Sequence, residues 1–157
     1  PSLAFLTINV GFLMPQAVGS FRDMQFDADH ARFSPDLDVA GLHGTLRVNR
    51  AREGLLLDGN FSAQLDMQCV RCLTTFGQNL NAHFEELYAF KNHPISQSGL
   101  IVPDSGKIDL APLVEEYLKL EIPIKPLCKP DCQGLCPICG ADLNVAACEH
   151  HVIVSLV

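Results

Sequence analysis

The sequence lacks tryptophan, has only two tyrosines and carries few charged residues. Of its 157 residues 18% are charged, and 18 acidic side chains against 11 basic ones give a formal net charge of −7 at pH 7. Proteins that coat duplex nucleic acid carry an excess of basic residues, so this function class is excluded. No stretch reaches the about 18 consecutive apolar residues of a membrane span, and we expect no membrane partner.

We expect no secretory leader. The apolar segment from Pro1 to Val18 has no basic n-region, and Asn9 and Pro15 interrupt it. We therefore expect a cytoplasmic protein. The hydrophobic share of 48% indicates a folded chain with a sizeable core and excludes intrinsic disorder.

The first half of the chain has the two-residue period of β-strands. Apolar and polar residues alternate without a break from Asn60 to Cys69, which predicts a half-buried strand. Before it, the charged stretch 50–54 separates two apolar runs and predicts a hairpin turn. Alternating residues from Phe76 to Phe90 predict a further antiparallel strand. The segment 92–106 has the proline, glycine and serine content of an exposed loop.

One helix is predicted from Asp109 to Glu121. Asp109 is a suitable N-cap, Pro112 falls in the tolerated first turn, and Pro123 ends the run. Apolar residues recur at helical spacing between these limits. The glutamates of this segment are expected to form a solvated face and not a catalytic pair.

These patterns predict an α+β fold, mainly an antiparallel sheet that could close into a barrel, with one principal helix. The expected domains are a β-rich domain at residues 1–122 and a Cys-rich, zinc-bound tail at residues 123–157 that packs on it. The apolar positions of the strand and the helix should be buried: Phe61, Leu65, Met67, Leu113, Val114 and Tyr117.

Seven cysteines are many for this length, and their odd number excludes complete pairing into intramolecular disulfides. Without a secretory leader, closely spaced cysteines are typical of metal ligands in a reducing compartment. The close pairs are Cys69 with Cys72, Cys128 with Cys132, and Cys136 with Cys139, and Cys148 precedes His150 and His151.

Eight candidate ligands divide evenly into two zinc tetrahedra. Cys136-Pro-Ile-Cys139 is a zinc knuckle, and Gly140 can supply the positive φ that lets backbone amides approach the sulfurs. Cys148 and His150 would complete this first tetrahedron, with His151 as a substitute for His150. The other tetrahedron then consists of Cys69, Cys72, Cys128 and Cys132.

Other groupings of the same ligands stay open. The four tail cysteines from Cys128 to Cys139 could share one ion, although four ligands within a dozen residues would be cramped. One ion could instead join the pair at Cys69 and Cys72 to the pair at Cys136 and Cys139. The thiols could also be reduced and free of metal.

The predicted sites have the composition of structural zinc sites and not of catalytic ones. Closed, sulfur-rich tetrahedra leave no position for water, whereas a catalytic zinc keeps one open. Alternatively, the chain could be a thiol redox or zinc-sensing protein that uses its Cys-x-x-Cys pairs. For Cys69 and Cys72, however, no helical pattern follows that would activate a thiolate. No phosphate-binding glycine loop or nucleophile motif is present, so we expect a protein that is not an enzyme and has no small-molecule substrate.

Four stretches share the pattern of one known family: residues 54–59 (GLLLDG), 69–73 (CVRCL), 108–118 (IDLAPLVEEYL) and 126–144 (PLCKPDCQGLCPICGADLN). They resemble the YceD family, the large ribosomal RNA subunit accumulation proteins. The resemblance ends at Asn144, so Cys148 and His150 are assigned as ligands by spacing alone. It implies a role in ribosome biogenesis that supports accumulation of large-subunit ribosomal RNA.

The charge of the chain constrains that implied role. Zinc-bound cysteines are deprotonated, so two sites of the predicted composition would take the net charge from −7 to about −10. We therefore expect a ribosome assembly factor or a basic ribosomal protein as partner, with only weak direct binding of precursor ribosomal RNA. An RNA contact could use Arg47, Arg50, Arg52 and Arg71, although these residues are more simply interpreted as a solvated hairpin tip.

Overall fold

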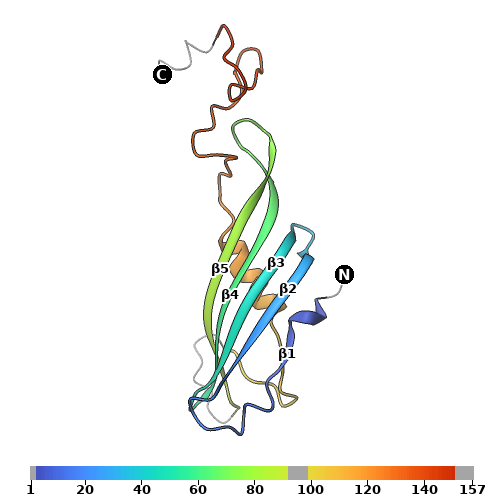
Figure 1. Ribbon diagram of the computed structural model, residues 1–157, viewed down its shortest axis with the longest axis vertical. Coiled ribbons are helices and arrows are strands. Elements are labelled where there is room, and N and C mark those ends of the chain that lie inside the picture. Colours follow the sequence, from blue (N-terminus) through green and yellow to red (C-terminus); the bar gives the residue numbers. More distant parts are fainter. Residues whose placement is uncertain (1–2, 92–98, 151–157) are drawn as a thin grey trace. The chain divides into compact units, whose positions relative to one another are not determined.

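The structure is a computed structural model that describes residues 3–91 and 99–150 (Figure 1). Contacts divide the chain into two compact units. The first unit comprises Pro1–Leu65 and Asn79–Glu121, and the second comprises Asp66–Gln78 and Ile122–Val157. The second unit thus joins the end of a hairpin to the Cys-rich tail. A domain boundary between residues 122 and 123 stays a prediction, since contacts do not test independent folding.

Four long strands form the main sheet: β2 (Phe21–Ser34), β3 (Leu37–Arg50), β4 (Gly54–Gln68) and β5 (Thr75–Ala89). They lie in the order β2-β3-β4-β5, and β3 is antiparallel to both β2 and β4 (Figure 1). The hairpin predicted around residues 50–54 is confirmed as the β3–β4 turn, and the strand predicted from residue 60 begins earlier, at Gly54.

The expected closure into a barrel is wrong. Among the described residues β2 and β5 are the two edges of an open four-stranded sheet and do not pair with each other. A sheet of four strands has fewer strands than even the five-stranded, partly open barrel of the OB-fold. The predicted antiparallel sheet with one principal helix is otherwise confirmed.

Short elements flank the sheet. A 3-10 turn, η1 (Ala4–Leu6), leads into β1 (Thr7–Asn9), which pairs antiparallel with β6 (Lys107–Asp109). No strand was predicted for these segments or for β2, because three residues show no period and β2 is rich in charged residues. Of the predicted loop 92–106, residues 92–98 lie outside the described residues.

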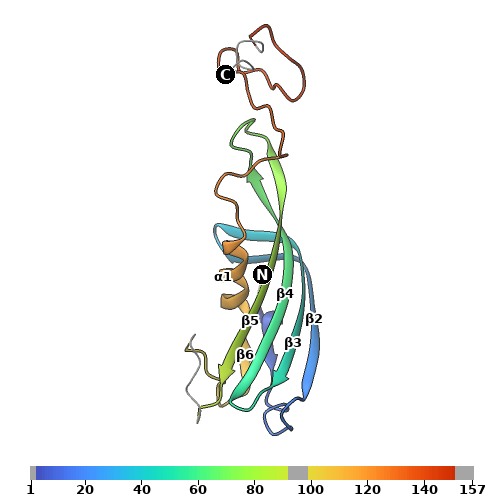
Figure 2. The same ribbon diagram turned by 90° about the vertical axis from the view of Figure 1, so that its left-hand side faces the viewer.

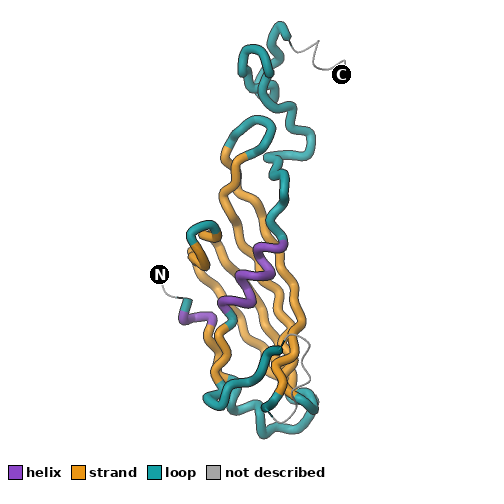
Figure 3. Tube along the Cα trace, turned by 180° about the vertical axis from the view of Figure 1, so that it is seen from behind, coloured by secondary structure: helices purple, strands orange, loops and turns teal. Residues whose placement is uncertain are grey.

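The predicted helix is present as α1 (Ala111–Leu120). Leu110, and not Asp109, occupies the N-cap position, but the Asp109 carboxylate still accepts a hydrogen bond from the Ala111 amide at 3.0 Å. Pro112 lies in the first turn, as expected. The helix lies across one face of the main sheet, which Figures 2 and 3 show from the side and from behind.

Aromatic rings fill the space between this face and α1. The Phe61 ring lies 6.0 Å from the Phe84 ring, which lies 5.2 Å from the ring of Tyr117 on the helix. Glycines leave room for these rings: a Cβ at Gly44 would lie 2.2 Å from Phe61, and one at Gly59 would lie 2.5 Å from Phe84. Because glycine has no side chain at these two positions, the rings pack directly on the strand backbone.

The predicted burial holds for half of the residues named. Phe61, Leu113 and Val114 are buried, as expected. Leu65 and Met67 are only half-buried, because they lie beyond Ala63, the last buried residue of β4. Tyr117 is also half-buried, since its hydroxyl reaches out to donate a 2.6 Å hydrogen bond to Glu86.

The other face of the main sheet is polar. Alternate residues of β3, β4 and β5 are exposed there, among them Thr45, Asn60 and Asn81. This is the pattern of an antiparallel sheet with one face on the core and one in water. Within residues 3–91 and 99–150 no helix is long and apolar enough to cross a membrane.

Candidate metal centres

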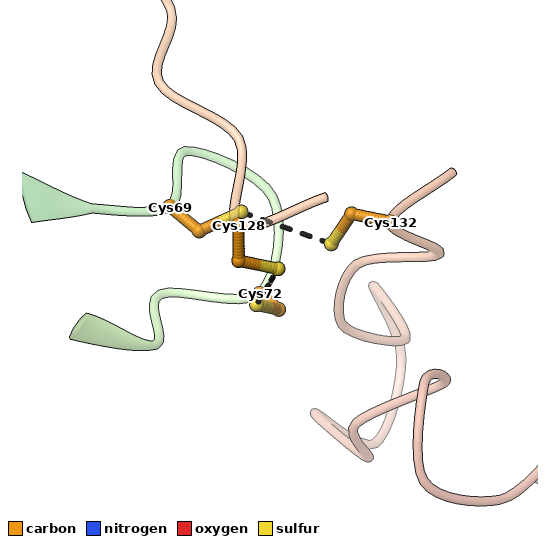
Figure 4. A group of neighbouring side chains, drawn as sticks. All are labelled: Cys69, Cys72, Cys128 and Cys132. Carbon is orange, nitrogen blue, oxygen red and sulfur yellow. Dashed lines mark hydrogen bonds between the residues drawn. The ribbon is translucent and has the colours of Figure 1, made fainter. Parts of the chain in front are cut away.

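The first cysteine group brings together segments that are distant in the sequence. Cys69 and Cys72 lie in the loop between β4 and β5, and Cys128 and Cys132 come from the segment after α1 (Figure 4). Their four sulfur atoms all lie within 4.8 Å of one another. The second unit contains all four residues.

The spacing of these sulfurs suits a tetrahedral metal. The Cys69 and Cys132 sulfurs are 3.7 Å apart, and those of Cys72 and Cys128 are 3.6 Å apart (Figure 4). A tetrahedron with metal–sulfur bonds of about 2.3 Å has edges of about 3.8 Å. The sulfurs are thus already close to the separation that a zinc ion would require.

Backbone hydrogen bonds shape the loop that carries Cys69 and Cys72. The Leu73 amide donates to the Cys69 carbonyl at 2.9 Å, and the Cys69 amide donates to Thr74 at 2.9 Å. Leu73 adopts a positive φ of 64°, which is uncommon for a residue with a side chain. The tight turn lets both cysteines point into the same space.

The tail is fastened to this loop by further hydrogen bonds. The Val70 amide donates to the Pro126 carbonyl at 3.0 Å, and the Leu135 amide donates to the Arg71 carbonyl at 3.2 Å. The Arg71 guanidinium donates to the Cys132 carbonyl at 3.0 Å. The position of both cysteine pairs is thus fixed by contacts other than the sulfurs themselves.

The thiols of the first group influence one another's ionisation. Burial opposes ionisation of Cys69, but hydrogen bonds from backbone amides, including that of Cys72, lower its pKa to about 6. Burial, followed by the contact with the Cys72 thiol, raises the pKa of Cys128 to about 12. The raised pKa of Cys128 opposes its deprotonation beside the other sulfurs, and a cation between them would remove this opposition. A divalent metal would supply that cation.

This first group is closed to solvent. Cys69, Cys72 and Cys132 are buried, and partly buried apolar residues pack around them. The surrounding apolar residues are Phe76, Leu127 and Leu135, and the fourth ligand, Cys128, is itself partly buried. A buried, all-sulfur tetrahedron has no free position for water, which is the arrangement of a structural site.

The second group consists of Cys136, Cys139, Cys148 and His150, whose ligand atoms also all lie within 4.8 Å of one another. The Ile138 amide donates to the Cys136 sulfur at 3.4 Å, and amide hydrogen bonds from Cys139 and Ile138 lower the pKa of Cys136 to about 6. Burial is the main cause that raises the pKa of Cys148.

The positive φ predicted for Gly140 is confirmed, and the zinc knuckle itself stays a prediction. Gly140 has a φ of +77°, and its amide donates to the Cys136 carbonyl at 2.9 Å. This group is less enclosed than the first, since Cys139 is exposed and His150 is half-buried. His151, the substitute ligand, lies outside the described residues.

The structure gathers the eight candidate ligands into the two groups of the two-site hypothesis. Neither rival grouping is found in the part of the chain that the structure describes: the four tail cysteines do not form one cluster, and Cys69 does not gather with Cys136. The residues fit zinc by donor type, number and sulfur spacing. Binding of zinc itself stays a prediction.

Asn144 is a residue whose role sequence reasoning missed. Its side-chain amide donates to the Cys132 sulfur at 3.3 Å, and its side-chain oxygen accepts from the Gln133 amide at 2.8 Å. It thereby orients a ligand of the first group, although it lies in the sequence between the knuckle and Cys148. Its place at the end of the recognised 126–144 motif was the only sequence signal.

Three of the four arginines of the predicted basic patch contact other groups of the protein, and the fourth, Arg52, is exposed. Arg47 forms a two-point ion pair with Asp23, and Arg50 donates to the Met14 carbonyl at 2.9 Å. Arg71 belongs to the second unit and is held by Cys132. These contacts support the simpler interpretation of the arginines as structural or solvated residues.

A third potential group lies in the first unit. Asp58, His83 and Glu85 have ligand atoms within 4.8 Å of one another, and Asp58 and His83 form a 2.9 Å ion pair. His83 and Glu85 are exposed and Asp58 is 39% exposed, and a solvated ion pair explains the proximity of Asp58 and His83.

Comparison with known proteins identifies a family whose shared region includes both cysteine groups. The family model described as "Large ribosomal RNA subunit accumulation protein YceD" matches residues 57–154. The match continues past Asn144, where the motif comparison ended, and includes Cys148 and His150. All eight candidate ligands therefore lie within the region shared with this family.

Relatives are found in mycobacteria and in plants. An uncharacterized protein of Mycobacterium tuberculosis is 34% identical over 104 residues, which cover 62% of this chain and 49% of that protein. The Zea mays protein named large ribosomal RNA subunit accumulation protein YCED homolog 1, chloroplastic, is 25% identical over 137 residues, covering 64% and 45%. The chain thus spans about half the length of these relatives. No solved structure matches this chain.

Proposed function

Because the chain belongs to the YceD family of large ribosomal RNA subunit accumulation proteins, we propose that it supports accumulation of large-subunit ribosomal RNA by binding, without turning over a substrate. The observation that carries this proposal is the family match over residues 57–154, which includes both cysteine groups. We place this activity in the cytoplasm.

In this proposal two zinc ions are structural. One would hold the β4–β5 loop against the tail through Cys69, Cys72, Cys128 and Cys132, and the other would fold the tail through Cys136, Cys139, Cys148 and His150. Few regular elements support these segments, since the second unit contains no helix within the described residues. Metal binding would then supply much of the folding free energy of this unit.

The proposed partner is a ribosome assembly factor or a basic ribosomal protein carried by a precursor of the large subunit. The formal charge of −7 would become about −10 with both metal sites filled. Such a surface attracts basic proteins and repels phosphates. The structure adds support because Arg47, Arg50 and Arg71 are occupied by contacts within the protein.

The test is sedimentation of the purified chain with ribosomal particles, followed by crosslinking and identification of the bound protein or RNA. We expect the chain in fractions that contain large-subunit precursors, crosslinked to protein. In parallel, binding to naked large-subunit RNA at physiological salt should be weak. Tight RNA binding with a steep salt dependence and no protein crosslink would overturn the choice of partner.

A redox function is the second candidate, and one observation favours it. The pKa of Cys69 is lowered to about 6, which would leave a thiolate at neutral pH if the site held no metal. The two proposals differ in what an oxidant does. A thiol redox protein would exchange disulfides far faster than free thiols with zinc present, whereas a structural zinc site would react only after the metal is removed.

A further inference from the structure

The face of the main sheet that α1 does not cover carries a row of hollows with overlapping lining residues. One hollow of about 620 Å³ is lined by side chains of β2, β3 and β4, and its neighbours extend the surface to β5 and share several lining residues. We call this surface the outer face. Its charged and histidine residues are Asp23, Asp27, His43, Arg47, Asp58, His83 and, beside Asp58, Glu85.

The outer face is acidic. Four carboxylates stand against one guanidinium, and that Arg47 is already held by both carboxylate oxygens of Asp23. The first unit as a whole holds 14 of the 18 acidic and 8 of the 11 basic residues, a net charge of −6. The outer face therefore belongs to the more acidic part of the protein.

Each of two histidines contacts only one of the two carboxylate oxygens of an aspartate on the outer face. His43 contacts only Oδ1 of Asp27, at 2.5 Å, and His83 contacts only Oδ1 of Asp58, at 2.9 Å. Among the described residues the second oxygen of either aspartate forms no ion pair, although the Arg47 guanidinium also attracts Asp58. Asp27 is 77% exposed. Each carboxylate thus keeps one oriented acceptor for a cationic group.

Uncharged hydrogen-bonding groups lie between the carboxylates. Thr45, Asn60, Ser62 and Asn81 line the hollows with hydroxyl and amide groups. Such side chains can pair with the backbone of an extended peptide, while the carboxylates pair with its lysines and arginines. The face is therefore equipped both for charge and for backbone recognition.

Other occupants suit this surface less well. Of the described exposed large apolar residues, only Phe21 lies close to it, and the Arg47 guanidinium covers that ring at 4.4 Å. The centre of a protein dimer interface usually needs apolar anchors, and single-stranded RNA needs exposed aromatic rings together with cations. The outer face offers neither set.

We propose that the outer face is a docking surface for an extended, lysine- and arginine-rich protein segment. This inference rests on the proposed function and names the surface by which a basic partner would be held. Asp27 and Asp58 are its central contacts, since each presents an oriented carboxylate on a different strand. Glu85 adds a third charge beside Asp58.

The experiment uses the full chain with zinc and a 16-residue peptide that alternates lysine or arginine with glycine or serine. The face variant is Asp27→Asn with Asp58→Asn, which keeps the side-chain shape and a hydrogen-bond acceptor for each histidine. The matched control is Glu116→Gln with Glu121→Gln on and just after α1, which changes the net charge equally. Binding is measured by fluorescence anisotropy at physiological salt.

We expect the face variant to bind the peptide about 3- to 10-fold more weakly than the wild type, as two exposed charge contacts would predict. The loss of peptide affinity in the helix variant should be less than half of the loss in the face variant. Replacing both aspartates by lysine should abolish binding through repulsion. In the wild type, the peptide should protect Asp27, Asp58 and Glu85 from carbodiimide labelling and leave Glu116 reactive.

Several results would overturn the inference. One is an absence of peptide binding by the wild type, and another is an equal loss of peptide affinity in the two variants. The third is protection of these carboxylates by an RNA oligonucleotide or by self-association.

Pelleting of the same variants with ribosomal particles separates this inference from the proposed function. If the wild type and the face variant pellet equally, the docking surface is wrong and the family role stands. If neither pellets, the proposed function fails independently of the peptide result.

Discussion

The side-chain amide of Asn144 donates a hydrogen bond to the sulfur of Cys132 at 3.3 Å. The same side chain accepts from the Gln133 amide and so fixes the loop that carries this ligand. Amide-to-sulfur bonds of this kind stabilise thiolates and orient them toward a metal. Asn144 is therefore a positioning residue for the first cysteine group and not a ligand.

Replacing Asn144 by alanine should weaken metal binding at the first group. We expect about a 10- to 100-fold loss of zinc affinity at that site, because outer partners of metal ligands contribute on this scale. The measurement is competition with a chromophoric chelator. The variant should release one ion at a lower chelator concentration than the wild type does, and the other ion at the same concentration.

The Asn144→Asp variant serves as the internal control for this effect. It keeps the oxygen that accepts from Gln133 but loses the donor to sulfur and adds a negative charge near the thiolate. Its affinity loss should equal or exceed that of the alanine variant. Wild-type affinity in both variants would show that the bond to Cys132 does not support the metal.

The metal content follows from the grouping of the ligands. Protein purified without chelator should contain about two zinc ions per chain by elemental analysis. The Cys72→Ser and Cys139→Ser variants should each contain one ion, since they affect different groups. Val70→Ser is a matched control, because Val70 lies between two ligands but points its half-exposed side chain to solvent.

The number of zinc ions per chain also tests the assignment of the eight ligands to two separate sites. A single ion in the wild type would contradict the two-site hypothesis, and an absence of metal would contradict the zinc proposal for this chain. Loss of both ions from either cysteine variant would show that the groups depend on each other. The Asn144 contact, which connects the segment after the knuckle to Cys132, is the structural route for such coupling.

The cysteine groups could be predicted from the sequence because ligand spacing is a local property. The pairs 69/72, 128/132 and 136/139 each place two sulfurs within one turn, and four-coordination then limits how the pairs combine. Asn144 could not be predicted in the same way. Its role depends on the path of the tail after Gly140, which no periodicity encodes.

The fold was predictable where one period persists over many residues. The alternation from Asn60 and the helical spacing before Pro123 identified β4 and α1. Closure of the sheet was not predictable, since it depends on whether the edge strands β2 and β5 meet. Leu65 and Met67 follow the strand's alternation, yet no packed layer covers them fully.

Gly44 should be intolerant of a side chain. A Cβ at this position would lie 2.2 Å from the Phe61 ring, and Phe61 is 2% exposed, so neither group can move away easily. We expect Gly44→Ala to lower the free energy of unfolding by about 1–3 kcal/mol through overpacking. Chemical denaturation of the zinc-loaded protein measures this change.

A double-mutant cycle identifies the cause. Phe61→Leu alone should also destabilise the protein, but it removes the ring that Gly44→Ala would strike. The double variant should therefore be more stable than the sum of the two single losses predicts, by about 0.5–3 kcal/mol. Strict additivity would show that the strand tolerates the methyl group and that Gly44 is not needed for the packing of Phe61.

The two tyrosines should remain protonated at a pH where free tyrosine ionises. A hydrogen bond to Glu86 is the main cause that raises the pKa of Tyr117 to about 12, and burial raises the pKa of Tyr88 to about 12. In the unfolded chain both should titrate near pH 10. Absorbance of the folded protein at 295 nm should therefore change little up to about pH 11, whereas denatured protein should show full phenolate absorbance there.

The sign of the effect on stability follows from these shifts. A folded pKa above the unfolded value means that folding favours the protonated phenol, so the stabilisation is complete below about pH 10 and is lost as the pH rises through about 12. Tyr117→Phe removes the bond to Glu86, so its destabilisation should be largest at neutral pH and should shrink above pH 11. Glu86→Gln keeps an acceptor but removes the charge, and it should lower the pKa of Tyr117 toward 10. An unchanged Tyr117 titration in that variant would mean that burial, and not Glu86, holds the proton.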